Sequence, residues 1–236
     1  MKLGSVAAQW CYPVKSMRGE GCASLRFDAR GVVGDRLYAV RNAEGKFGSG
    51  KTTRRFRQMD GLLDFSARSL DGSEAPELQF PCGQRLRGDS PGLDEALSEA
   101  LGQPVTLARE DEVSHLDAGP VHLLSSSSLQ VLQAALPGTA IDARRFRPNL
   151  LIQCEADGPA EVDWIGRTLC LGPELRLQIS APTQRCGMVA AAQAGLAQAP
   201  ELLRHLAQGL DMQFGLYARV LVPGLVRLGD TVILEP

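Results

Sequence analysis

The sequence lacks any C-x-x-C pair, although it contains six cysteines, at positions 11, 22, 82, 154, 170 and 186. Zinc ribbons and plant-type iron–sulfur clusters need closely spaced cysteines, so both classes are excluded. The G-x-G-x-x-G fingerprint of flavin and nicotinamide sites is also missing. We therefore expect no built-in route for taking electrons from NAD(P)H.

Long apolar runs and a strong charge of one sign are also absent. The stretch Met1–Trp10 is too short and too interrupted for a signal peptide, and nothing approaches the roughly 20 apolar residues of a membrane span. A net charge of −2 gives no global reason to bind nucleic acid or an anionic membrane. The sequence predicts a cytoplasmic protein with reduced thiols that binds neither.

Short apolar or alternating runs bounded by Gly, Pro and Asp dominate the 236 residues, which include 25 Gly and 14 Pro. This pattern predicts a mostly β architecture with a few helices, of the α+β class. Strands are expected at 25–27, 37–40, 62–67, 105–108, 150–153, 168–171, 175–180, 217–222 and 231–234. Helices are expected at 94–101, 126–135 and 200–207, the second capped by Ser125 or Ser126.

The apolar periodicity breaks between Arg109 and Pro120 without a disordered linker. We expect two closely packed parts, residues 1–112 and 113–236. A ligand site between them is plausible because ligands favour domain interfaces.

Residues 45–52 match the G-x-x-x-x-G-K-[ST] pattern of a nucleotide-binding P-loop. That loop should follow a buried strand directly and open a helix, whereas here a polar turn precedes it and cations fill the first turn of the supposed helix. A nucleotide-hydrolysing function is therefore disfavoured. The cations Lys51, Arg54, Arg55 and Arg57 form either an anion-binding rim or an ordinary solvated loop.

Three further groups carry chemistry. Lys15, Ser16 and Arg36 together offer a point charge, a hydroxyl and a planar donor fork, which suit a phosphate. Arg147 and Asn149 stand at the mouth of an expected strand, where Asn can donate and accept at the edge of a heterocycle. Cys186, beside Arg185, is favoured as the thiolate that binds metals or attacks electrophiles.

Four short motifs resemble those of the MOSC family, in the order Y-P-V-K-S, G-D-R, F-R-P-N and R-C. The resemblance continues through Phe214-Gly215 and Val226–Asp230. The resemblance covers nearly the whole chain. It is closest to proteins in which an N-terminal MOSC β-barrel domain precedes a MOSC domain, including the mitochondrial amidoxime-reducing components and short bacterial relatives. It implies those two domains here.

The resemblance also implies a site for the molybdenum cofactor in its molybdopterin form, and not for pyridoxal phosphate. Cys186 matches the metal-ligating cysteine, and Lys15, Ser16 and Arg36 match the phosphate-holding groups. The other matching cofactor contacts are Asp117, Arg147, Asn149 and Arg185. At Gly119 relatives can have serine, and the spacing from Asp117 to Arg147 differs slightly from theirs.

The implied activity is reduction of small N-hydroxylated or N-oxide compounds by oxygen-atom transfer, with electrons from a separate ferredoxin, cytochrome or flavin reductase. Two alternatives stay open: sulfur transfer through a Cys186 persulfide, and a non-enzymatic carrier of the cofactor. Molybdenum content, cyanide-labile sulfur and turnover discriminate among the three.

Overall fold

The computed structural model describes residues 1–236 except 155–157, 159, 194 and 236. Its largest element is a closed barrel of seven strands, because the first and last strands of one sheet also pair with each other. In sheet order these are β13 (Leu150–Cys154), β12 (Val121–Ser125), β16 (Gln213–Val222), β15 (Leu175–Gln184), β14 (Thr168–Leu171), β18 (Thr231–Leu234) and β1 (Lys2–Cys11). All these pairs are antiparallel except β12 with β13.

Alternation of side chains fills the barrel. In β18, Val232 and Leu234 point inward while the residues between them are exposed, as the two-residue period of a strand requires. The short β2 (Glu20–Gly21) extends this sheet beyond β1. A separate ribbon of β17 (Gly224–Arg227), β3 (Ser24–Asp28) and β4 (Gly31–Val32) adds apolar residues to the same core.

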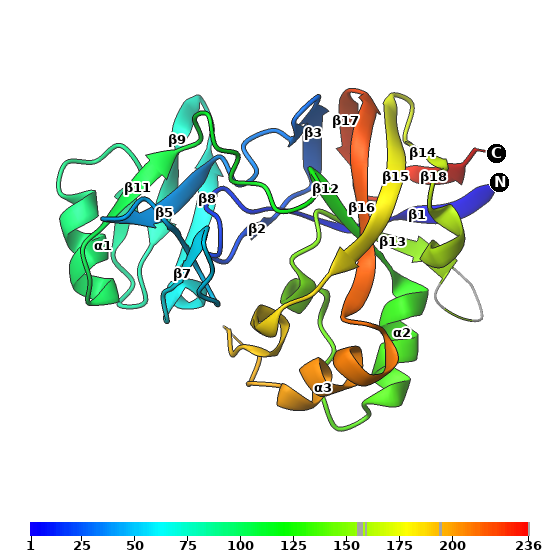
Figure 1. Ribbon diagram of the computed structural model, residues 1–236. Helices are drawn as coiled ribbons and strands as arrows, with labels where there is room; N and C mark the ends of the chain where they lie inside the picture. The colour runs from blue at the N-terminus through cyan, green and yellow to red at the C-terminus, as the bar shows by residue number, and fades with distance from the viewer. Residues whose placement is uncertain (155–157, 159, 194, 236) are drawn as a thin grey trace.

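A second lobe is formed by the chain between β4 and β12 and has its own apolar core. One of its sheets contains β11 (Val105–Arg109), β5 (Tyr38–Asn42), β6 (Phe47–Ser49) and β7 (Phe56–Gln58). The other contains β10 (Arg85–Arg87), β9 (Ser73–Gln79) and β8 (Ser66–Leu70). Figure 1 shows this lobe beside the barrel. The chain passes between the two parts in the connections β1–β2, β4–β5 and β11–β12.

The three predicted α-helices are confirmed: α1 (Leu93–Leu101), α2 (Ser126–Ala135) and α3 (Pro200–Gly209). The Ser125 hydroxyl accepts a hydrogen bond of 3.0 Å from the Ser128 amide, which satisfies a free donor at the start of α2. Pro200 stands at the start of α3, where its missing N–H costs nothing. α2 and α3 share an apolar cluster at one end of the barrel.

The strand expected at residues 62–67 is wrong in its first half. A 3-10 turn, η1 (Leu62–Asp64), precedes β8, and Gly61 enters it with a φ of 87°. Leu62 and Phe65 are both buried at a spacing of three residues, which suits a 3-10 turn, whereas a strand would place them on opposite faces. Three further 3-10 turns are η2 (Ala143–Phe146), η3 (Ala160–Trp164) and η4 (Gly187–Ala190).

The P-loop pattern at residues 45–52 does not form a nucleotide site. Residues 45–58 contain β6, a turn and β7, with no helix whose N-terminus could face a phosphate. This agrees with the sequence-based argument against a nucleotide-hydrolysing function.

Candidate functional site

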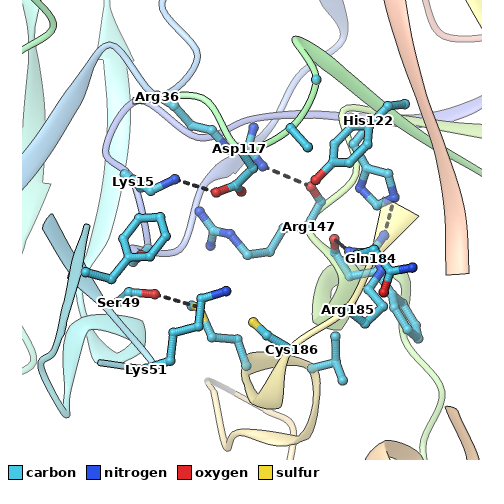
Figure 2. Close-up of a pocket in the computed structure, with 18 of the residues that line it drawn as sticks. Lys15, Arg36, Ser49, Lys51, Asp117, His122, Arg147, Gln184, Arg185 and Cys186 are labelled. Carbon is cyan, nitrogen blue, oxygen red and sulfur yellow. Dashed lines mark hydrogen bonds and ion pairs between the residues drawn. The ribbon is translucent and has the colours of Figure 1, made fainter. Parts of the chain in front are cut away.

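A cavity of about 510 Å³ lies between the barrel and the second lobe. All eight residues that the sequence singles out line it, although they come from distant parts of the chain. They are Lys15, Ser16, Arg36, Asp117, Arg147, Asn149, Arg185 and Cys186. Figure 2 shows most of them converging on the same space. The roles expected for these residues remain predictions.

Lys15 and Ser16 lie in the connection between β1 and β2. The Lys15 ammonium is buried and donates to the His115 carbonyl at 2.8 Å and to Asp117 Oδ1 at 2.6 Å. Burial lowers the pKa of Lys15, and the Asp117 carboxylate opposes that shift. The Ser16 hydroxyl donates to the Gly48 carbonyl at 3.0 Å, so its proton is used within the protein and only its oxygen lone pairs remain.

Arg36 and Arg147 approach each other around the ring of Tyr12. Their guanidinium carbons lie 5.0 and 4.3 Å from the ring centroid, which places both charges against an aromatic ring. Arg36 forms an ion pair with the fully buried Asp35. Arg147 donates to the Met17 carbonyl at 2.5 Å, but its second terminal nitrogen, Nη2, is buried and has no hydrogen-bond partner among the described residues.

The unpartnered Arg147 nitrogen indicates a missing acceptor, because a buried donor without a hydrogen bond is costly. Burial and the charge of Arg36 lower the pKa of Arg147 to about 10, so the guanidinium stays positive at neutral pH. An anionic ligand would satisfy both the donor and the charge. These properties fit a phosphate group.

Arg185 is tied to the backbone of the barrel. Its Nε donates to the Phe214 carbonyl at 2.8 Å and its Nη1 to the Phe146 carbonyl at 2.9 Å. Its Nη2 contacts His122 Nε2. Burial and the charge of Arg185 hold the pKa of His122 well below its usual value, so the imidazole is neutral and can accept this hydrogen bond. Arg185 therefore contributes a positive charge while most of its donors stabilise the pocket wall.

Asn149 also serves the fold. Its Oδ1 accepts from the His122 amide at 3.1 Å, and its Nδ2 donates to the Trp10 carbonyl at 3.3 Å. These bonds join β12 and β1 where β13 begins. One N–H of the Asn149 amide remains for a ligand in the pocket.

Asp117, half-exposed, lies in the connection between β11 and β12 and is the single acidic side chain among the described residues that line the cavity. Burial opposes ionisation of its carboxyl, but the charges of Lys15 and Arg36 outweigh that effect and lower its pKa to about 2. Asp117 is thus an acceptor at neutral pH and not a source of protons.

Cys186 lies two residues after the end of β15 and directly before η4. Its side chain is half-buried, and Figure 2 shows the sulfur pointing into the pocket. The residues just after it contact the second lobe: the Ser49 hydroxyl lies 3.9 Å from the Met188 sulfur, and a Cβ on Gly50 would lie 2.6 Å from Met188 Cγ. The segment carrying Cys186 is therefore held between the two lobes.

Sequence reasoning missed several residues that line the same cavity, including Ser49, His122, Gln184 and Tyr217. His122 carried a detectable signal, since a histidine inside the apolar stretch Val121–Leu124 breaks the pattern of a buried strand. The four cations in and after the P-loop pattern do not all face the cavity. Lys51 and Arg55 line it, whereas Arg54 and Arg57 are exposed outside it.

Within the described residues, no group of three or more His, Cys, Asp or Glu side chains could hold a metal ion. A metal at this site would therefore depend on Cys186 together with ligands that a cofactor brings. The described part of the chain also has no helix long and apolar enough to cross a membrane.

The MOSC domain family matches residues 110–233, and the MOSC N-terminal beta barrel domain matches residues 3–68. The chain belongs to the MOSC family. It is 24% identical to human mitochondrial amidoxime-reducing component 1 and 23% identical to the mouse protein, covering 99% of this chain and 83% of each relative. A crystal structure of the YUAD protein from Bacillus subtilis has the same fold, with a TM-score of 0.51 and 14% identity over 98% of this chain and 94% of that one.

The two-barrel organisation expected from the resemblance is confirmed by these matches and by the closed barrel. The division at residues 112 and 113 remains a prediction. β1 of this MOSC protein pairs with β13 and β18, so its N-terminal strand is part of the MOSC barrel.

Replacing Lys15 by Met should weaken retention of a bound anionic cofactor by about 1.5 to 3 kcal/mol, the usual scale for a charged hydrogen bond. Asp117, its half-exposed partner, can regain water, so this MOSC protein should still fold. Arg36 is a poorer target because its removal would leave Asp35 buried and unpaired. Molybdenum and pterin remaining after dialysis would be measured, with Lys46→Met as control, since Lys46 pairs with the exposed Glu44. Equal retention by both variants would contradict the prediction.

Proposed function

We propose that this protein reduces small N-hydroxylated or N-oxide compounds with a molybdenum cofactor in its molybdopterin form. The observation that carries the proposal is the convergence of the Cys186 thiol and the unpartnered Arg147 Nη2 on one cavity. A thiolate and a guanidinium suit the two ends of such a cofactor: a soft ligand for the metal and a donor for the phosphate. Similarity to amidoxime-reducing components supports the substrate class.

The overall reaction consumes two electrons and two protons for each N–O bond broken, and it releases an amine or amidine and water. When bound, the cofactor supplies the two-electron centre that takes up the substrate oxygen. The protein's own residues bind and orient. Lys15, Arg36 and Arg147 would hold the phosphate, Cys186 would ligate the metal, and Asp117 would keep Lys15 charged.

The neutral His122 has a positioning role in this proposal. Its Nε2 accepts from Arg185, which fixes a guanidinium beside the Cys186 segment without adding a second positive charge. Phe146 and Val189 give the cavity an apolar wall on the barrel side, and Phe214 packs against Phe146 with the ring centroids 4.5 Å apart.

Electrons should come from a separate ferredoxin, cytochrome or flavin reductase. The protein loaded with cofactor should reduce benzamidoxime with an artificial one-electron donor and be nearly inactive with NADH alone. Adding a flavin reductase with a ferredoxin or cytochrome should restore NADH-driven activity. Amidine formation would be measured under each condition, with metal-free protein as the blank.

Substantial turnover with NADH alone would contradict the need for a partner protein. No turnover with any donor, at one molybdenum per chain, would rule out the proposed reaction and favour a carrier of the cofactor. Cyanide-labile sulfur on Cys186 without bound molybdenum would favour sulfur transfer instead. The cytoplasmic location expected from the sequence is also a prediction, to be tested by cell fractionation.

A further inference from the structure

The cavity has a one-sided charge. Among the described residues that line it, seven are basic and one, Asp117, is acidic. The basic residues are Lys15, Arg36, Lys51, Arg55, Arg145, Arg147 and Arg185. Two of them are paired, Lys15 with Asp117 and Arg36 with Asp35. The other five have no carboxylate within ion-pair distance in the described part of the chain, although the protein as a whole has a net charge of −2.

The proposed cofactor accounts for only part of this excess. In the proposed function its phosphate lies against Lys15, Arg36 and Arg147, and Arg185 lies beside Cys186. The Arg145 guanidinium donates to the carbonyls of Ala140 and Ala197. Lys51 and Arg55 remain. Both come from the loop between β6 and β7 in the second lobe.

Lys51 and Arg55 are gathered around one aromatic ring. Lys51 Nζ lies 5.4 Å from the Phe56 ring centroid and Arg55 Cζ lies 5.3 Å from it. Lys15 Nζ lies 5.3 Å from the same centroid but is paired with Asp117, so within the described residues Lys51 and Arg55 are the cations at this ring without a carboxylate partner. An anionic group near the ring would offset their charges.

Lys51 has a free ammonium. Within the described residues it makes no hydrogen bond or ion pair, and its one partner there is the Phe56 ring. Arg55 is held in place, because its Nη2 donates to the carbonyls of Ser114 and Leu116. Arg55 thus provides a positive charge in a fixed position, and Lys51 provides one that can move toward a ligand.

The same loop lies against the segment that carries Cys186. Ser49 and Gly50, which precede Lys51, contact Met188, two residues beyond Cys186. Figure 2 shows the side chains of Lys51 and Cys186 directed into the same pocket. A molecule reacting near Cys186 would therefore have Lys51 and Arg55 within reach on the side of the second lobe.

We propose that Lys51 and Arg55 form an anion subsite for the substrate, so that the protein prefers N-hydroxylated compounds bearing a carboxylate or phosphate group. This inference rests on the proposed function. The same chemistry could instead hold a second phosphate on a larger form of the cofactor, and the experiment separates the two sources.

The first test compares 4-carboxybenzamidoxime with benzamidoxime, which differ by one carboxylate. The wild-type protein should show a kcat/KM ratio of about tenfold or more in favour of the anionic compound, the effect of roughly one charged hydrogen bond. Lys51→Ala should move that ratio toward one, mainly through KM, whereas Lys51→Arg should preserve most of it. Lys46→Ala, which removes a lysine outside the cavity, should leave the ratio unchanged. Added salt should lower the wild-type ratio.

The second test does not depend on turnover. Binding of 4-carboxybenzamidine and benzamidine to the cofactor-loaded protein would be measured by calorimetry, and the carboxylate compound should bind more tightly to the wild type than to Lys51→Ala. Any of three results would overturn the subsite. They are equal affinity of the carboxylate compound for the wild type and Lys51→Ala, no detectable binding of that compound, and equal kcat/KM values of the wild type for the two substrates. A loss of molybdenum from Lys51→Ala as large as that from Lys15→Met would also overturn it, because the loop would then hold the cofactor. If neither substrate is reduced while the binding difference persists, the proposed reaction fails and the anion subsite stands.

Discussion

Cys186→Ser should lower molybdenum-dependent activity by at least about a hundredfold, since changes that merely weaken the support of a metal ligand already cost 10- to 100-fold. A hydroxyl is a harder and far less acidic donor than a thiol, so it should not replace the thiolate on a soft metal site. The fold should persist because the Cys186 side chain is half-buried and has no described hydrogen bond in the barrel. Activity with an artificial donor and molybdenum per chain would be measured together.

Cys170→Ser is the matched control for that experiment. Cys170 Sγ lies 2.9 Å from Glu235 Oε1, where a serine hydroxyl can donate in the same way, and this residue does not line the cavity. The control should keep its molybdenum and its activity. Normal turnover by Cys186→Ser with its metal would disprove the central assignment of the site.

Gly215→Ala should destabilise the folded protein by about 3 kcal/mol or more, combining overpacking with left-handed backbone strain. Gly215 has a φ of 79°, and a Cβ there would lie 2.4 Å from Leu124 Cδ2, 2.6 Å from His122 Nε2 and 2.8 Å from the Leu123 carbonyl. The backbone of β12 cannot move away because it is paired on both sides. The measurement is urea unfolding followed by circular dichroism.

Gly72→Ala separates the two contributions. Gly72 has a similar φ of 72°, but a Cβ added there would have no neighbouring atom within 4 Å, so only the backbone cost of roughly 1 to 2 kcal/mol should appear. Equal losses of stability in the two variants would show that crowding against His122 and Leu124 is not the cause.

The sequence predicted those elements whose signals are local. α2 is predictable because Ser125 offers a cap immediately before an apolar helical stripe. β14 and β18 are bounded by turn residues and alternate or run apolar over their whole length. The prediction for residues 62–67 was wrong in its first half because a short apolar run does not by itself distinguish a strand from a turn, and Gly61 opens a 3-10 turn through its left-handed backbone.

The candidate site was predictable as a set of residues but not as an arrangement. Lys15 and Asp117 are 102 residues apart, and no local pattern shows that their charges meet. The resemblance to a known family supplied the members of that set. What it could not supply is how each side chain is used within the protein, such as the engagement of Arg185 and Asn149 with backbone groups. Those bonds depend on how β12, β13 and β16 come together.

The position of β1 in the barrel has a consequence for synthesis on the ribosome. β1 is made before the second lobe. Its last two residues pair with the short β2, but its other partners, β13 and β18, are made long after it. The core of the second lobe lies wholly between Val14 and Leu107, so that lobe can complete its contacts while residues 2–9 of β1 still lack their partner strands. We expect the nascent chain to depend on chaperones during this interval. The cavity between the lobes would then be completed late, when barrel closure brings Cys186 up to a second lobe that is already folded.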